Sequence, residues 1–165
     1  MGRLDRKGID KLKTIIKRIK NVLLTDPTLS AEIKKVEVVA PRLLPDISSS
    51  LVPYIGVAPV RSSEAYVAQR KEITHLVDIY AVTYLQVQEN AIIGDSVKKG
   101  ILEIVEDIQT AVRGHRLPEA GVNYLSKPID ISSTEYSIAG YGDQVYLMVA
   151  SMTLQCVRLI TLTLP

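Results

Sequence analysis

Residues 143–164 read DQVYLMVASMTLQCVRLITLTL, and this stretch decides the fold. From Tyr146 onward, alternate residues are mainly apolar, and a period of two predicts a β-strand with one apolar face. At about 3.3 Å per residue, some twenty residues of strand would be roughly 65 Å long, whereas a compact chain of this size has a radius of gyration of about 15 Å. We therefore expect the strand to bend or break, or to end against something outside its own domain, most simply a second copy of the chain.

The composition indicates one globular domain over residues 1–165. Hydrophobic residues make up 47% of the chain, with eight Tyr but no Trp and no Phe, so we expect a core of Ile, Val, Leu and Met. The single cysteine, Cys156, excludes an internal disulfide and is expected to be a buried structural thiol on the last strand. No stretch is typical of a transmembrane helix, so we expect no membrane contact.

A basic amphipathic helix is predicted over about residues 4–24. Apolar residues recur there at three- and four-residue spacing, and Pro27 disfavours continuation of the helix. Residues 1–20 contain eight Lys/Arg and two Asp, a net charge of +6, whereas residues 21–165 have a net charge of −4. Such a segment is either a solvated face or a contact for nucleic acid or an acidic partner. Its basic residues beside the apolar stripe are Lys11, Lys13, Lys17, Arg18 and Lys20.

A second helix is predicted from about Val97 to Arg113. Asp95 or Ser96 is a suitable N-cap, and Gly114 is a suitable stop because glycine readily adopts positive φ. Its acidic residues fall on the solvent side. The apolar stripe of this helix consists of Ile101, Ile104, Val105, Ile108 and Val112.

The remaining segments are predicted to be extended. Val36–Val39 is a candidate short strand, and residues 40–60 hold four of the eight prolines, which indicates a Pro-rich connection. Tyr54–Val57 is a possible short edge strand within that connection. From Glu64 to Gln88 the odd positions are mainly apolar, which predicts another strand that is long for its domain.

An antiparallel pair is predicted to complete the fold, with strands near 122–137 and 145–164 joined around residues 140–143. Only one helix then lies between strands, which disfavours a parallel doubly wound fold. We expect an α+β fold: a mainly antiparallel sheet of strands of mixed length, two principal helices packed on it, and a long C-terminal strand.

No catalytic, cofactor-binding or metal-binding residues are expected. The chain has no Gly-rich phosphate loop, and its two histidines, His75 and His115, lack the spacing of a helical metal site. His75 is expected to be a packed or interface histidine, and Ser62 and Ser63 are available as nucleophiles without a pattern that singles them out. A small enzyme using His75 or His115 is the weakest alternative.

Three pieces of the second half form a familiar pattern: GILEIVEDI at 100–108, GHRL at 114–117, and VYLMV at 145–149. A helix, a short loop and a hairpin with a long last strand resemble the tail terminator and tail completion (neck) proteins of tailed bacteriophages. The resemblance implies a structural, non-enzymatic virion protein without cofactors. It implies a homohexameric ring that caps the tail tube and connects it to the neck or head, assembled in the host cytoplasm.

The overlong strands would supply the contacts between ring subunits. Residues predicted to lie at subunit contacts are Arg158, Thr161, Thr163, Tyr80 and Tyr84. His115 and Arg116, in the loop after the second helix, are predicted to contact the neck or the tail tube. The alternative is a head–tail connector that contacts DNA, or another nucleic-acid-binding module, through the basic N-terminal helix.

Overall fold

The computed structural model describes residues 6–41, 51–141 and 145–161, and side chains over 11–41, 51–140 and 146–161. Over these residues the elements follow the order helix, helix, strand, strand, strand, helix, helix, strand, strand. They are α1 (Arg6–Thr25), α2 (Pro27–Glu32), β1 (Lys35–Val38), β2 (Tyr54–Val67), β3 (Arg70–Tyr84), α3 (Gln88–Ile93), α4 (Ile101–Val112), β4 (Asp130–Tyr141) and β5 (Val145–Thr161).

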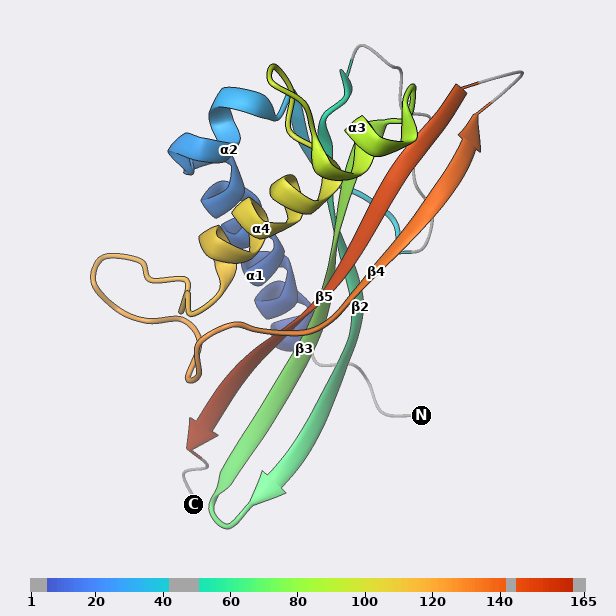
Figure 1. Ribbon diagram of the computed structural model, residues 1–165. Coiled ribbons are helices and arrows are strands. Elements are labelled where there is room, and N and C mark those ends of the chain that lie inside the picture. The colour runs from blue at the N-terminus through green and yellow to red at the C-terminus, as the bar shows by residue number, and fades with distance from the viewer. Residues whose placement is uncertain (1–5, 42–50, 142–144, 162–165) are drawn as a thin grey trace.

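The strands form one five-stranded sheet in the order β1-β2-β3-β5-β4. β1 runs parallel to β2, and the other neighbours are antiparallel. The two long helices, α1 and α4, pack side by side on one face of the sheet (Figure 1). This arrangement confirms the predicted α+β fold with two principal helices and a long C-terminal strand.

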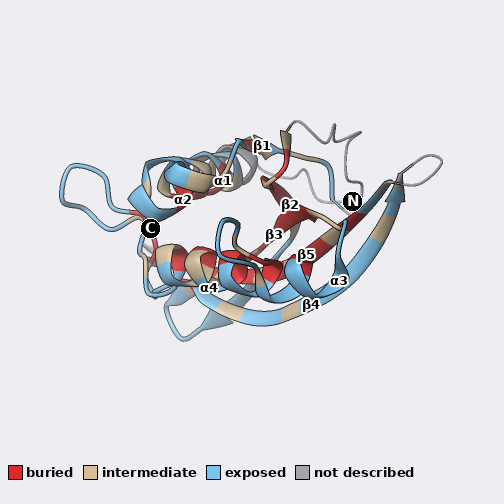
Figure 2. Ribbon diagram, turned by 45° about the horizontal axis from the view of Figure 1, so that its top comes forward, coloured by how far each residue is buried: buried red, intermediate tan, exposed pale blue. Residues whose placement is uncertain are grey.

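The apolar stripes of both helices meet the sheet in one core. Ile19 of α1 and Ile108 of α4 are fully buried, as are Ile79 of β3 and Leu154 of β5 on the sheet face beneath them. Figure 2 shows the buried sides of the helices turned toward the strands. The opposite face of the sheet contributes a second, smaller cluster: Val52, Tyr54, Ala58, Tyr80, Val82, Leu147 and Val149. The middle of the sheet is therefore buried on both faces, which favours near-continuous apolar runs in β3 and β5.

The three central strands continue past the helical layer (Figure 1). β2 and β3 form a hairpin, and every residue from 61 to 70 is exposed. β5 runs beside β3 to the same end, where Thr161 pairs with Arg70. We call residues 61–70, together with Leu159–Thr161 of β5, the arm. The last strand is thus continuous over 17 residues and extends beyond its own core.

The prediction of one strand from Glu64 to Gln88 was wrong. A turn at Ala68 and Gln69 separates β2 from β3, and Ala68 adopts a left-handed conformation with φ of 54°. No Gly, Pro, Asn or Asp marks this turn, so the usual turn chemistry was absent from the sequence.

Tyr54–Val57 is the start of β2 and lies between β1 and β3, so its prediction as an edge strand was also wrong. β2 accommodates Pro59 because the register shifts between Pro59 and Arg61, and an irregularity of this kind tolerates a residue without an N–H.

The second principal helix begins four residues later than predicted. α4 starts at Ile101 with Gly100 as its N-cap, while the Asp95 side chain accepts hydrogen bonds from the amides of Val97 and Lys98, both at 2.7 Å. Asp95 therefore caps a turn and not the helix. The stop at Gly114 is confirmed, since this residue follows the C-cap with φ of 78°.

Two further boundaries differ from the predictions. α3 was not predicted, because six residues give too little periodicity to recognise. β4 begins at Asp130 and not near residue 122, since residues 113–129 form a loop that returns along the end of α4 and contains the isolated bridge between Glu119 and Val122.

Candidate functional site

The arm presents apolar side chains to solvent. Tyr66 is 67% exposed and Val67 is 60% exposed at its tip, and Leu159 of β5, which pairs with Glu72 of β3, is 37% exposed. The arm is held by its own contacts: Lys71 forms an ion pair of 2.6 Å with Glu64, and its ammonium lies 5.9 Å from the centre of the Tyr66 ring. An ordered projection with an exposed aromatic tip is suited to insertion into another molecule.

Both edge strands of the sheet leave backbone groups without a strand partner in the described residues. β1 covers only Tyr54–Val57 of β2, so the outer edge of β2 is open from Ala58 to the arm tip. β4 forms the opposite edge, and its pairing with β5 ends at Gln155. Ser126 then covers part of β5, since its amide donates to the Val157 carbonyl (2.9 Å). Open edges of this kind favour pairing with another chain.

Arg158 does not project into solvent as a free contact residue. It lies on the helix-facing side of β5 opposite Ile73, and its guanidinium carbon is 4.3 Å from the centre of the Tyr124 ring. Its Nε and Nη1 atoms are buried and have no hydrogen-bond partner among the described residues. The other predicted residues of this strand end are Thr161, which is exposed, and Thr163, which lies outside the described residues.

Of the two tyrosines predicted at subunit contacts, Tyr80 is only 7% exposed, and its hydroxyl donates to Asp78 Oδ2 at 3.3 Å. Little of the Tyr80 side chain is therefore available to a neighbour. Tyr84 is half-buried and lines a cavity at the end of the sheet opposite the arm. The structure thus does not bring Tyr80 and Tyr84 together with Arg158 and Thr161.

His115 and Arg116 lie in the loop after α4. The Nδ1 atom of His115 accepts a hydrogen bond from the Leu117 amide at 3.0 Å, and the Arg116 side chain is exposed. The Arg116 carbonyl accepts hydrogen bonds from the amides of Tyr124 and Leu125, which fixes the base of the loop. Contact of this loop with a neck or tube protein stays a prediction.

The basic residues of α1 divide into two groups. Lys13 and Lys17 are exposed, and Lys11 and Lys20 are half-buried. Arg18 is committed to the fold: it pairs with Glu119, donates to the Leu117 carbonyl at 2.9 Å, and packs over the Tyr124 ring. Arg18 therefore ties α1 to the 113–129 loop. Of the five basic residues predicted for this contact, the four lysines remain for a nucleic acid or an acidic partner.

The structure brings Ser62 and His75 together across the β2–β3 hairpin. Ser62 Oγ lies 2.6 Å from His75 Nδ1, and the histidine is 2% exposed. Burial lowers the pKa of His75, and the charges of Arg158 and Lys11 add to this effect. His75 Nε2 has no partner among the described residues, so no carboxylate orients the ring as in a catalytic triad. The sequence did not reveal this pair, because the hairpin itself was not predicted.

Cys156 is fully buried, which confirms the predicted buried thiol, and burial raises its pKa to about 12. Within the described ranges, no three His, Cys, Asp or Glu residues gather as metal ligands. Over the same residues, every helix is too short or too polar to cross a bilayer.

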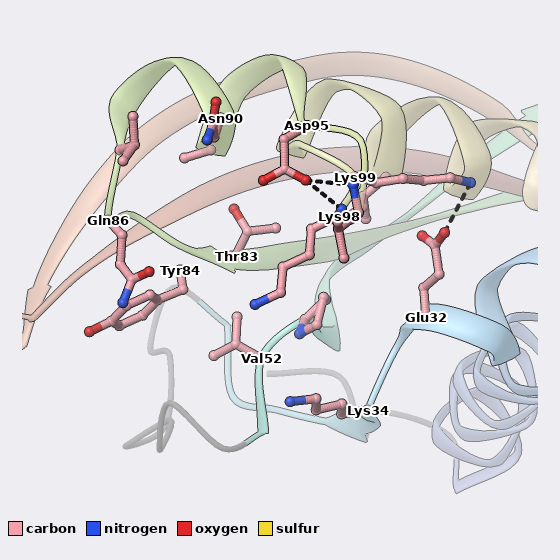
Figure 3. Close-up of a pocket in the computed structure, with 15 residues that line it drawn as sticks. Glu32, Lys34, Val52, Thr83, Tyr84, Gln86, Asn90, Asp95, Lys98 and Lys99 are labelled. Atoms are coloured by element: carbon pink, nitrogen blue, oxygen red, sulfur yellow. Dashed lines mark hydrogen bonds and ion pairs between the residues drawn. The ribbon is translucent and has the colours of Figure 1, made fainter.

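A cavity of about 390 Å³ lies between the α2–β1 connection and the segment from α3 to α4 (Figure 3). Its walls include Lys34, Thr83, Asn90 and Lys98. Sequence reasoning missed this cavity, since its residues come from four separate segments that no motif links.

No protein-family model matches the chain, and no curated protein matches its sequence.

Proposed function

We propose that this chain is a structural subunit of a closed homo-oligomeric ring, of the kind that caps the tail tube of a tailed bacteriophage and connects it to the neck. The ring is hexameric in the proteins that the sequence resembles. The proposal assigns no catalytic residue and no cofactor, and it places the protein in the virion.

One observation supports the proposal most strongly: the arm extends the sheet beyond the helical layer and exposes Tyr66 and Val67 at its tip. A monomeric protein gains nothing in stability from a hairpin whose ten residues 61–70 are all exposed, and exposed aromatic side chains on such a projection are typical of interfaces.

The arm and the open edge of β4 belong to different parts of the subunit, because β2 and β4 are the two outer long strands of the sheet. β4 also exposes Tyr136 and Ile138. Contact of one face with a different face of the next copy is heterologous, and it produces a ring when the rotation closes. The subunit therefore has the two unlike faces that ring closure requires.

Native mass spectrometry of the purified chain, followed by electron microscopy of the same sample, tests the proposal. We expect one discrete oligomer with rotational symmetry and a central opening. A chain that stays monomeric up to the highest concentration at which it does not precipitate, or that forms only symmetric dimers, would contradict the proposal.

A second candidate is contact with nucleic acid, either in a DNA-contacting head–tail connector or in another binding module. It is favoured by the exposure of Lys13 and Lys17 on α1, with Lys20 beside them and no ion pair from the three in the described residues. Binding of duplex DNA should weaken with salt, with a logarithmic slope of about −3 for three phosphate contacts. Absence of binding at low salt would exclude this candidate.

A further inference from the structure

The cavity beside Thr83 has the composition of a ligand site. Its volume of about 390 Å³ lies within the usual range for small-molecule pockets, roughly 300–1,000 Å³. Apolar residues such as Val52, Ala91 and Ile104 form part of its wall, and polar side chains converge on the same space. Figure 3 shows the hydroxyl of Thr83 on β3 directed toward α3, and Asn90 of α3 is also a lining residue.

Thr83 supplies a buried polar group that has no partner among the described residues. The residue is 5% exposed, and its hydroxyl has no hydrogen-bond partner among the described residues. It lies on the helix-facing side of β3, where the preceding odd-numbered residues Val77, Ile79 and Ala81 are all apolar. Buried hydroxyls in folded proteins are nearly always hydrogen-bonded, so the Thr83 hydroxyl is available to a ligand that enters the cavity.

Two of the lysines around the cavity form no ion pair among the described residues. Glu32 is engaged by Lys99 at 3.5 Å, and the same ammonium pairs with Asp107 at 2.7 Å. Lys34 and Lys98 form no ion pair with the described residues.

Asp95 is the remaining acid at the cavity. The amides of Lys98 and Val97 hold its pKa below its ordinary value, and the charge of the Lys98 side chain adds to this effect. Figure 3 shows the Lys98 side chain reaching across the cavity toward Val52, with Lys34 on the opposite wall. Because Asp95 is satisfied by two amides, the side chains left to meet a ligand are cations and neutral hydrogen-bonding groups.

The cavity wall formed by residues 94–100 is closed by backbone packing. A Cβ atom on Gly100 would lie 2.3 Å from the Gly94 nitrogen and 2.4 Å from the Ile92 oxygen, so only glycine fits there. The Asp95 amide also donates to the Lys98 carbonyl at 2.8 Å. The backbone that presents Lys98 is therefore preorganised before any ligand arrives, and preorganisation favours binding.

We propose that this cavity binds an anionic ligand, a carboxylate or a phosphate monoester attached to a small apolar group. The ammonium groups of Lys34 and Lys98 bind the anionic oxygens, the Thr83 hydroxyl donates to one of them, and the apolar group packs against Val52 and Ile104. The site lies at the other end of the sheet from the arm, and it does not depend on the ring proposal.

The experiment titrates the ¹⁵N-labelled chain with sodium benzoate, with phenyl phosphate and with neutral benzyl alcohol, and follows amide chemical shifts. We expect the two anions to shift the resonances of Val87, Asn90 and Lys98, and benzyl alcohol to bind at least about fivefold more weakly. The stronger of the two anions identifies the ligand as a carboxylate or a phosphate.

Three variants and one control make the test specific. Lys98→Gln and Lys34→Gln should each weaken anion binding about fivefold, whereas Lys17→Gln on the exposed side of α1 should leave it unchanged. Thr83→Val preserves shape and should weaken binding without loss of stability. Lys34 and Lys98 are exposed, so their substitution should not impair folding. The two lysine variants therefore test the proposal even if Thr83→Val fails to fold. The proposal is overturned if no anion shifts these resonances, or if Lys98→Gln and Lys17→Gln bind alike.

Discussion

The guanidinium carbon of Arg158 lies 4.3 Å from the centre of the Tyr124 ring. Arg18 of α1 packs on the same ring at 4.5 Å, so one tyrosine links the last strand, the first helix and the 113–129 loop. Arg158 was predicted from the sequence to lie at a subunit contact. In the structure, Arg158 packs inside the subunit against Tyr124.

Tyr124→Leu should lower the free energy of unfolding by about 1–2 kcal/mol, because two cation–π contacts are lost while most of the apolar volume remains. Arg158→Met should lower the free energy of unfolding by less than Tyr124→Leu does. It removes one cation–π contact, but it also removes buried N–H groups that have no acceptor among the described residues. Urea denaturation of the three proteins measures both differences. A larger loss of unfolding free energy for Arg158→Met than for Tyr124→Leu would contradict this account of Arg158.

The stability of the protein should depend on pH through His75. Burial, Arg158 and Lys11 lower its pKa in the folded state, so the unfolded chain binds the proton more readily. The stabilisation by the neutral ring is complete above the ordinary pKa of about 6.5 and is lost as pH falls from there toward the lowered folded value. His75→Gln should remove this dependence while keeping a hydrogen-bonding group near Ser62.

The measurement compares urea unfolding of the wild-type chain and His75→Gln between acidic and neutral pH. The difference between the two free energies should change by up to about 1.4 kcal/mol per pH unit within the window. The two proteins differ only at residue 75, so the contributions of all other groups cancel in the comparison. Parallel pH profiles would mean that His75 takes up a proton equally well in both states.

Gly100→Ala should destabilise the fold by about 3 kcal/mol, because the new Cβ would overlap backbone atoms of Gly94 and Ile92. Gly114→Ala is the matched control: it meets no atom within 4 Å but must adopt a φ of 78°, which costs about 1–2 kcal/mol. Thermal unfolding of both variants measures which substitution destabilises the fold more. Equal losses would contradict the close backbone contact at Gly100.

The parts of the fold that the sequence predicted are those with long periodic patterns. α1, α4 and β5 each carry a regular apolar stripe, and their buried residues are the ones that the periodicity selects, such as Ile19, Ile108 and Leu154. Burial of one face determines such elements without knowledge of their partners.

The missed features depend on contacts between segments that are distant in sequence. The turn at Ala68–Gln69 has no residue type that marks a hairpin, so its position follows from pairing of β2 with β3. The Ser62–His75 pair exists only once that hairpin forms. In the sequence, Thr83 is one residue of a mainly apolar strand. Its place in a cavity follows only from the fold, which brings Lys34 and Lys98 to the same cavity. None of these relations has a local pattern that a single sequence could reveal.

The arm is predicted to form the subunit contact without contributing to the stability of the single subunit. Tyr66→Thr combined with Val67→Thr replaces two exposed apolar residues by a residue that favours strands, so the free energy of unfolding should change by less than about 0.5 kcal/mol. Val122→Thr is the matched control, because Val122 is 70% exposed in the 113–129 loop, away from the arm.

Sedimentation velocity of the wild-type chain, the Tyr66→Thr/Val67→Thr double variant and the Val122→Thr control tests the ring proposal most directly. The proposal predicts a single closed oligomer for the wild type and the control, and a folded monomer for the double variant. A double variant that assembles as well as the wild type, or a wild-type chain that sediments only as a monomer, would contradict it.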